Sequence, residues 1–428
     1  MLWLYRILFL PGLLLLAPAY LWRMRRRGGY RENFLHRFGG HAGLPAKRAG
    51  VRRIWLQAVS VGEVLAIAPL VEALVASGRV EIYLTVTTST GYQLAGERYG
   101  KQAIGIGYFP LDWWLFSRRA WQQIAPDLMI LTEGERWPEH LHQAAARGVP
   151  VLAINARLSD RTFRRMQSLG AVSRIMLTGI TRLLPGSAQD ATRFLELGFP
   201  AERLTTTGNI KLDVAIPRLE AAQLQTLRRE LGLPEGLVLM GSSTWPGEEA
   251  ALIEALSRTR ATGQRCSLLL VPRHAERRAE IERLLAATPL KFHFRSRGHA
   301  PGEVDVAVAD TTGELRRLLQ VADLVFVGKS LPPRTEGQTP VEAAALAKPI
   351  LFGPGMGNFR LIARDLLARR AALEVADAAA LAAVAPELLA DTARRDALAA
   401  AAAEWCRDNG GALDRTLAVI REELAKLG

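Results

Sequence analysis

Residues 54–78 read IWLQAVSVGEVLAIAPLVEALVASG, and this stretch decides the fold class. The apolar run from Ile54 to Val59 is typical of a buried strand, and Ser60-Val61-Gly62 supplies a tight turn after it. From Glu63 to Val75 the apolar residues recur at a helical period, which Gly78 closes. A strand, a turn and a helix in this order predict one repeating unit of a parallel sheet.

Similar strand patterns recur along the rest of the chain. In the first half, short β-rich runs, each followed by a helical or loop segment, occur at residues 80–88, 127–132, 149–154 and 174–178. In the second half they occur at residues 237–242, 267–271, 304–309, 324–327 and 350–352, with a helix at 275–287. The alternation predicts an α/β protein whose parallel sheets are covered on both faces.

A polar segment at residues 213–236 separates the two series, and a chain of 428 residues is too long for one ordinary core. We therefore predict two Rossmann-like doubly wound domains that face each other across a cleft, at residues 28–212 and 237–428. Residues 213–236 are predicted to be the linker and to contain a helix. The alanine-rich residues 379–403 and the final residues 411–426 are predicted helices, and the last one is a candidate to cross back to the first domain.

An apolar segment without charge runs from Ile7 to Trp22. One arginine, Arg6, precedes this segment, and four arginines follow it: Arg23, Arg25, Arg26 and Arg27. A signal peptide has the reverse charge order, so an uncleaved anchor or interfacial helix is favoured, although Ala17-Pro18-Ala19 resembles a cleavage site. Residues 1–27 are thus predicted to hold the body of the protein at the cytoplasmic face of a membrane. Headgroup-level anchors are expected at Trp3, Tyr5, Tyr20 and Trp22.

A formal charge of +13 indicates an anionic partner, which is a membrane surface, a phosphorylated substrate or nucleic acid. Nucleic acid is the least favoured, because no zinc-finger spacing, RNP-like motif or helix-turn-helix occurs. Cys266 and Cys406 lie far apart and do not indicate a disulfide framework, in keeping with a reducing compartment.

Ligands of open parallel sheets bind beyond the carboxyl ends of the strands. Three polar clusters of the first half lie at such positions: Ser60 to Glu63, Glu133-Gly134-Glu135-Arg136-Trp137-Pro138, and Gly208 to Asp213 with Lys211. Each also has an ordinary structural interpretation, as a helix-start carboxylate, a helix cap and a solvated linker charge. Position alone leaves both interpretations open.

A second set of polar residues follows strands of the second half. Arg273-His274 comes after a buried strand, and Thr311 to Glu314 and Thr339 to Glu342 each open a predicted helix. A cation and two helix termini at one sheet edge suit an anionic ligand, and Glu342 is a candidate for a ribose. Helix capping alone would equally explain Thr311 and Thr339.

A metal site is not expected. His140 and His142 are two positions apart on a predicted helix and cannot share a face, and no Asp-x-Asp pair follows a strand.

Taken in order, these motifs resemble the Kdo (3-deoxy-D-manno-octulosonic acid) transferases of lipopolysaccharide biosynthesis, a family with the GT-B fold. The resemblance covers nearly the whole chain. It is carried by residues 59–63, 85–88, the Glu-x-Glu-x-Trp-Pro run at 133–138, and residues 154–159, 208–213, 271–274, 310–315 and 340–344.

The resemblance implies an inverting glycosyltransferase at the cytoplasmic face of the inner membrane, which transfers Kdo from CMP-Kdo to a lipid A precursor. It implies that Glu63 is the general base and that Glu133 and Lys211 support the transition state. The implied CMP-binding residues are Arg273, His274, Thr312, Gly313, Glu314, Thr339, Pro340, Val341 and Glu342. No metal or other cofactor is implied, and the implied partners are the two substrates and an anionic membrane surface.

Four positions depart from the family pattern. Gly328-Lys329-Ser330 stands where the family has Gly-Gly-Ser, Trp245-Pro246-Gly247 where it has His-Glu-Gly, and Gln338-Thr339-Pro340 where it has His-Asn-Pro. Arg136 replaces an apolar residue. Two alternatives therefore stay open: a GT-B enzyme that uses another nucleotide sugar, and a noncatalytic paralogue that binds nucleotide or lipid.

Overall fold

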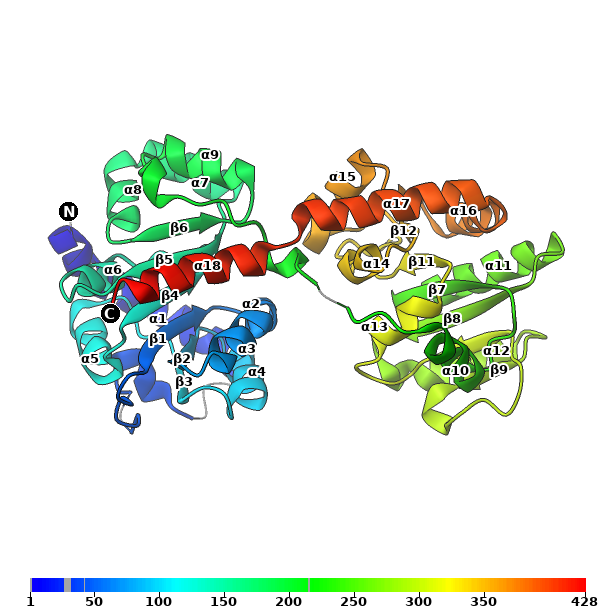
Figure 1. Ribbon diagram of the computed structural model, residues 1–428, viewed down its shortest axis with the longest axis horizontal. Helices are drawn as coiled ribbons and strands as arrows, with labels where there is room; N and C mark the ends of the chain where they lie inside the picture. Colours follow the sequence, from blue (N-terminus) through cyan, green and yellow to red (C-terminus); the bar gives the residue numbers. More distant parts are fainter. Residues whose placement is uncertain (1, 27–31, 42, 215) are drawn as a thin grey trace. The chain divides into compact units, whose positions relative to one another are not determined.

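The computed structural model describes residues 2–26, 32–41, 43–214 and 216–428. Arg27 of the predicted basic flank lies outside these residues, and so does the side chain of Tyr20. The chain forms two compact units (Figure 1). Unit 1 comprises Met1–Asp213 and Gly410–Gly428, and unit 2 comprises Val214–Asn409.

Unit 1 contains a six-stranded parallel sheet in the order β3-β2-β1-β4-β5-β6. Its strands are β1 (Arg52–Ala58), β2 (Val80–Val86), β3 (Gly105–Tyr108), β4 (Leu128–Thr132), β5 (Val151–Ala156) and β6 (Arg182–Pro185). The helices that follow them are α2 (Val61–Ala66), α3 (Ala68–Ala76), α4 (Ser89–Tyr99), α5 (Trp114–Ile124), α6 (Pro138–Ala145), α7 (Asp160–Ser168), α8 (Gly170–Leu177) and α9 (Ala188–Glu196).

Both faces of this sheet are buried. Ile54, Leu56 and Ala58 of β1 belong to one apolar cluster, whereas Trp55 between them belongs to another. This division follows from the two-residue period of a strand, which sends alternate side chains to opposite faces. Because helices cover both faces, the residues of β1 and β2 are almost all buried rather than alternately buried and exposed.

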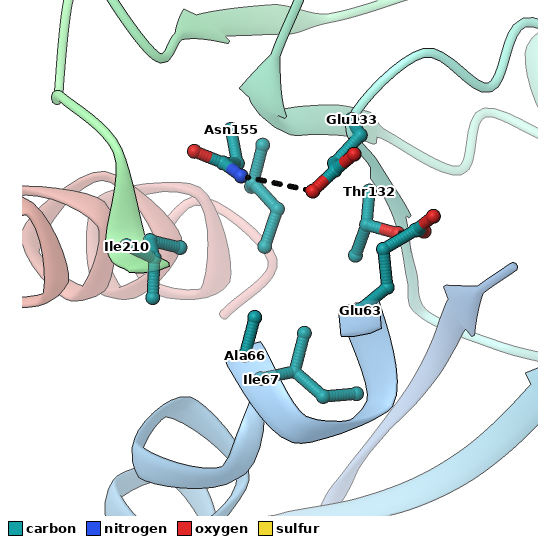
Figure 2. Close-up of a pocket in the computed structure, with 8 residues that line it drawn as sticks. Glu63, Ala66, Ile67, Thr132, Glu133, Asn155 and Ile210 are labelled. Atoms are coloured by element: carbon teal, nitrogen blue, oxygen red, sulfur yellow. Dashed lines mark hydrogen bonds between the residues drawn. The ribbon is translucent and has the colours of Figure 1, made fainter. Parts of the chain in front are cut away.

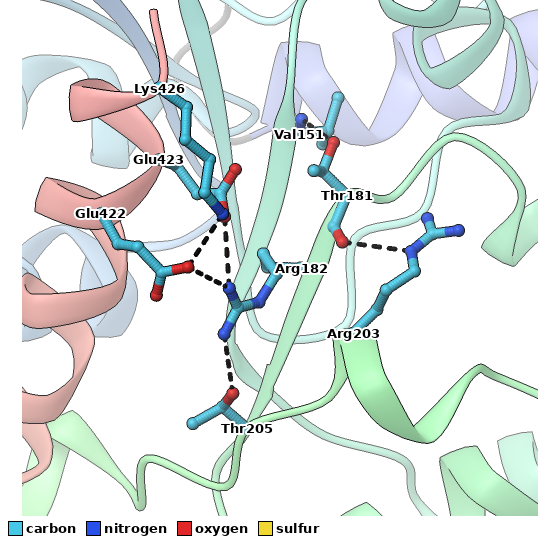
Figure 3. A network of polar contacts seen from close by, with 8 residues as sticks. All are labelled: Val151, Thr181, Arg182, Arg203, Thr205, Glu422, Glu423 and Lys426. Carbon is cyan, nitrogen blue, oxygen red and sulfur yellow. Dashed lines mark hydrogen bonds and ion pairs between the residues drawn. The ribbon is translucent and has the colours of Figure 1, made fainter.

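Helix α18 (Ala412–Ala425) packs against unit 1. Its Leu417 and Ile420 are buried in the same cluster as Ile54. Arg182 of β6 donates hydrogen bonds from Nη1 to Glu422 Oε1 at 3.0 Å and to Glu423 Oε1 at 3.2 Å (Figure 3). The end of the chain thus completes the first unit rather than the second.

Unit 2 contains a seven-stranded parallel sheet in the order β13-β12-β11-β7-β8-β10-β9. Its strands are β7 (Leu237–Thr244), β8 (Cys266–Pro272), β9 (Phe292–Phe294), β10 (Val306–Val308), β11 (Leu324–Val327), β12 (Ile350–Phe352) and β13 (Leu373–Glu374). Its helices are α10 (Ala221–Leu231), α11 (Glu248–Ala261), α12 (Arg278–Ala286), α13 (Leu315–Leu318), α14 (Val341–Ala345), α15 (Arg360–Ala368), α16 (Ala378–Ala390) and α17 (Thr392–Asn409).

Two sequence predictions of secondary structure need correction. The strand predicted at residues 174–178 belongs instead to α8 and the residue after it, and the neighbouring strand is β6. A short apolar run does not distinguish a buried strand from a buried helix, which explains the error. In addition, the segment predicted as a linker at 213–236 is largely part of unit 2, because the units divide after Asp213 and α10 lies beyond that point.

Helix α1 (Leu2–Arg26) docks on unit 1 through polar contacts near its start. Tyr5 donates a hydrogen bond to Asp112 at 2.6 Å, and Arg6 pairs with Glu139 at 2.7 Å. The hydroxyl of Tyr5 is therefore bound to the protein, contrary to the predicted headgroup position. In the described part of the chain, no single helix is long and apolar enough to cross a membrane. Leu2–Phe9 and Pro11–Ala19, bent by 41°, pass that test only as a pair.

Candidate active site

Three neighbouring strands of unit 1 end at one polar site. Since β1, β4 and β5 are adjacent in the sheet, the residues after them meet at its carboxyl edge. Figure 2 shows Glu63, Thr132, Glu133 and Asn155 around a small cavity there. The cavity measures about 10 Å³, which is room for one water molecule, so any larger ligand must bind outside it.

Glu63 lies on α2 and is only 7% exposed. Its Oε2 accepts hydrogen bonds from the backbone N–H of Val59 at 2.9 Å and from the Thr132 hydroxyl. The Ser60 hydroxyl donates to Oε1 at 3.3 Å. Burial raises the pKa of Glu63 above its ordinary value, while the bonds from Thr132 and Val59 act in the opposite direction. A carboxylate held in this way is fixed in position and is a stronger base than an exposed one.

Glu133 follows β4 directly and has a left-handed backbone with φ of 52°. Its carboxylate forms an ion pair with Lys211, and Asn155 Nδ2 donates to Oε1 at 3.5 Å. Lys211 lies in a 3-10 helix at residues 210–212, whose start is held by Asn209. The structure thus brings together all three residues for which the sequence predicts a catalytic role: Glu63, Glu133 and Lys211.

Two further polar residues of this site were not singled out from the sequence. Thr132 is the last residue of β4, and Asn155 belongs to β5 with φ of 50°. The one feature of the sequence that could have identified them is their position, because each lies near the end of a strand that neighbours β1 or β4. Strand order cannot be read from the local sequence, however, and so the contact of Thr132 with Glu63 could not be predicted.

Glu135 adds a third carboxyl group to the site. Its pKa is raised to about 7, first by burial and then by the negative charge of Glu63. The Glu135 carboxyl group is therefore partly protonated near neutral pH, which limits the negative charge gathered beside Glu63.

Arg136, a departure from the family pattern, is buried beside these carboxylates. Its guanidinium donates to the carbonyl of Gly134 at 3.3 Å and to that of Arg157 at 3.2 Å, and it lies 5.4 Å from the ring centre of Phe194. Burial lowers its pKa to about 10, so Arg136 remains charged at neutral pH. The side chain ties the loop after β4 to the loop after β5.

In unit 2, the predicted CMP-binding residues follow β8, β10 and β11, of which β8 and β10 are neighbours in the sheet. Arg273 and His274 follow β8, and the His274 ring meets the Trp245 ring edge-on at 5.2 Å. Arg316 reaches Glu342 at 3.8 Å and so links the segment after β10 to α14. Oε2 of Glu342 is buried and has no hydrogen-bond partner in the described part of the chain. Such an oxygen is available to a ligand hydroxyl.

Other predicted CMP-binding residues are engaged in structural contacts. Glu314 accepts two hydrogen bonds from Arg295, each at 2.8 Å, and this pairing is the main cause that lowers its pKa. Thr339 accepts a bond from the backbone N–H of Val341 at 3.2 Å, as a capping residue would. Thr312, Gly313 and Pro340 lie in the same two segments. The helices that these segments open, α13 and α14, have only four and five residues, so their dipoles are weaker than those of full-length helices.

Among residues 2–26, 32–41, 43–214 and 216–428, no group of three or more His, Cys, Asp or Glu side chains could hold a metal ion.

Two parallel-sheet α/β units, with polar residues gathered at the strand ends, are the arrangement of GT-B-like proteins. UDP-GlcNAc 2-epimerase from Neisseria meningitidis bound to UDP-GlcNAc shares this fold. It is 13% identical, covers 87% of this chain and 100% of that chain, and has a TM-score of 0.54. The C-terminal CMP-Kdo binding domain of WaaA from Acinetobacter baumannii is 29% identical over 43% of this chain and 95% of that chain, with a TM-score of 0.40.

Sequence comparison defines the family. The family described as 3-deoxy-D-manno-octulosonic-acid transferase (kdotransferase) matches residues 32–214. The 3-deoxy-D-manno-octulosonic acid transferase of Bordetella pertussis is 38% identical, over 97% of this chain and 98% of that relative. The chain belongs to the Kdo transferase family of glycosyltransferases.

Proposed function

We propose that the protein transfers Kdo from CMP-Kdo to a hydroxyl group of a lipid A precursor, at the cytoplasmic face of the inner membrane. Membership of the family supports the transferred sugar. The observation that carries the catalytic part is the buried Glu63 carboxylate, fixed by Val59 and Thr132 beside the ion pair of Glu133 and Lys211.

In this mechanism Glu63 is the general base. The acceptor hydroxyl loses its proton to the Glu63 carboxylate while its oxygen bonds to the anomeric carbon of Kdo with inversion. The bond from that carbon to the phosphate oxygen breaks, and CMP leaves with the electron pair. The raised pKa of Glu63 suits this role, because a base is most effective when its pKa lies near the working pH.

Glu133 and Lys211 support the same step. Lys211 brings positive charge beside the carboxyl groups of Glu63 and Glu133, and Glu133 fixes its ammonium group. A positive charge there favours the carboxylate form of Glu63 before the reaction and stabilises negative charge that develops during it.

On the donor side, the residues after β8, β10 and β11 are proposed to bind CMP. Arg273 is exposed and cationic, which suits the phosphate, and the free oxygen of Glu342 suits a ribose hydroxyl. Charge stabilisation by side chains would allow the leaving group to depart without a metal ion.

The membrane location is proposed from exposed apolar side chains of unit 1. Trp3 and Leu15 of α1 are 72% and 82% exposed. Trp114 and Leu115, at the start of α5, are also exposed, and the adjacent Trp113 donates a hydrogen bond to the carbonyl of Arg6. Large apolar side chains on one region of a surface are typical of contact with lipid.

The test is CMP release from CMP-Kdo in the presence of a lipid A precursor, with the glycolipid product identified by mass spectrometry. The wild type is expected to turn over, and Glu63→Gln is expected to lose about 10²- to 10⁴-fold in rate, the usual contribution of a general base. Glu202→Gln, at an exposed glutamate of the same unit, serves as the matched control. Equal rates for the wild type and Glu63→Gln would contradict the assignment.

A second candidate function is transfer from another nucleotide sugar. It is favoured by the contact of Lys329 Nζ with the Trp245 ring at 4.4 Å, since both residues depart from the family pattern. Thermal-shift measurements with CMP, UDP and GDP separate the two: stabilisation by CMP alone eliminates the second candidate. Catalytic turnover by the wild type would eliminate the noncatalytic alternative.

A further inference from the structure

A cavity of about 420 Å³ lies in unit 2 beside the carboxyl ends of β11 and β12. Residues 332–335 and 354–357, together with α15, form its wall. The volume lies within the roughly 300–1,000 Å³ that is usual for small-molecule sites. None of the residues proposed to bind CMP lines this cavity, but the Trp245 ring contacts both His274 and Arg334, so the cavity lies next to the proposed CMP site.

Three arginines line the cavity against a single glutamate, Glu374. Arg334 comes from the loop after β11, and Arg360 and Arg364 lie one turn apart on α15. Like charges at this spacing repel each other, which disfavours the arrangement unless an anion compensates.

The nearby carboxylates do not compensate these charges. Glu336 pairs with Lys329 at 3.2 Å, and Asp365 pairs with Arg369 at 3.5 Å. Moreover, Nε of Arg334 is buried and has no hydrogen-bond partner in the described part of the chain. Buried donors are rarely left unpaired in native proteins, so this one indicates a missing acceptor.

The loops that form the wall are held together before any ligand binds. Backbone N–H groups of Gly355 and Gly357 donate at 2.8 Å to the carbonyls of Ser330 and Thr335. The approach is so close that a Cβ atom at Gly355 would lie 2.2 Å from the Arg334 carbonyl oxygen. The guanidinium carbon of Arg334 also lies 5.3 Å from the centre of the Trp245 ring, which helps to orient it. The site is therefore largely preformed.

We propose that this cavity, the arginine pocket, binds the ionised carboxylate of the sugar that the donor carries. The proposal rests on the proposed function, in which that sugar is an octulosonic acid and hence an anion at neutral pH. Arginine is suited to the task, because its planar fork of N–H groups matches the two oxygens of a carboxylate. Met356 and Leu367 supply apolar surface for the carbon chain of the sugar.

The test compares the whole donor with its nucleotide alone. For the full-length protein, Arg334→Gln, Arg360→Gln and Arg364→Gln are assayed for the KM of CMP-Kdo and for the inhibition constant of CMP. Loss of a charged hydrogen bond to the carboxylate is expected to raise the KM for CMP-Kdo about 10-fold or more, with the CMP constant changed less than about twofold. Arg360→Lys keeps the charge and is expected to recover part of the loss.

Arg258→Gln is the matched control, because Arg258 is an exposed arginine of unit 2 on α11, paired with Glu254. Arg360 and Arg364 are exposed, so their replacement leaves folding intact even if Arg334→Gln does not fold. If all foldable variants keep the wild-type KM, or if CMP binding weakens in parallel, the arginine pocket does not bind the sugar carboxylate. If the wild type itself neither binds CMP nor turns over CMP-Kdo, the proposed function fails and the pocket proposal fails with it.

Discussion

Replacing Arg6 with methionine should destabilise unit 1, although Arg6 lies in the amino-terminal apolar helix. Glu139 is completely buried, and Arg6 donates to its two oxygens at 2.7 and 3.0 Å. After the replacement, Gln143 at 2.8 Å would be the one side-chain donor left to this charge among the residues that the structure describes. Breaking a buried ion pair in this way costs about 3–5 kcal/mol of the free energy of unfolding.

Hydrogen exchange of the full-length protein in detergent measures this loss for each unit separately. Peptides from β1 and β4 should exchange faster in Arg6→Met, whereas peptides from β7 and β8 of unit 2 serve as an internal reference. The double variant Arg6→Met/Glu139→Gln removes the unpaired charge and should recover much of the protection. Arg79→Gln, at an exposed arginine of unit 1, should change little. Unchanged exchange in Arg6→Met would show that α1 does not stabilise this unit.

Three further predictions concern unit 1. The pKa of Glu135 rises from 4.5 to about 7 on folding, so the stability that its protonated form contributes is complete below about pH 4.5 and is lost as the pH rises through 7. The wild type should therefore lose free energy of unfolding between pH 5 and pH 8, whereas Glu135→Gln should not. Measured by urea unfolding, the variant should gain up to about 3 kcal/mol relative to the wild type over this range. Lys211→Gln should lower kcat by about 100-fold, because the positive charge beside Glu133 and Glu63 is lost. Steady-state kinetics measure kcat, and the KM for the acceptor shows whether acceptor binding changes as well. Asp213→Ala removes the acceptor of two backbone N–H groups at the start of α18 and should lower the free energy of unfolding by about 1–2 kcal/mol. Hydrogen exchange in α18 should be faster in the variant. Equal protection in the variant and the wild type would refute the capping role of Asp213.

The repeating strand-turn-helix units could be predicted because each is a local pattern. The run from Ile54 to Val59 is almost the strand β1, and Glu63 lies on the helix that follows it. The same local argument failed at residues 174–178, where an apolar run too short to show its period belongs mainly to a helix. The brief strands β3, β9 and β13 were missed for a similar reason, because two to four residues carry little pattern of their own.

The candidate site was predicted only as far as position in the sequence allows. Glu63, Glu133 and Lys211 could be selected because each follows a strand or lies at a boundary, but their contact depends on the order β1-β4-β5, which no local pattern contains. Thr132 illustrates the limit, since its hydroxyl binds a carboxylate that is 69 positions away in sequence. Tyr5 shows the same limit for a residue outside the site. An aromatic residue beside an apolar run suggested a lipid headgroup contact, whereas its partner is Asp112, 107 positions away.

Helix α6 connects the amino-terminal helix to the loop after β4. Asp112 accepts hydrogen bonds from Tyr5 and from the backbone N–H groups of Glu139 and His140, which belong to the first turn of α6. Arg6 binds the side chain of Glu139 in the same turn. Because α6 begins only three residues after Glu135, the loop that carries the acidic residues is fixed at one end by contacts that α1 completes. A change in how α1 packs would therefore move the end of that loop. If catalysis requires the loop to be held in place, the Arg6→Met variant should lose transferase activity in addition to stability.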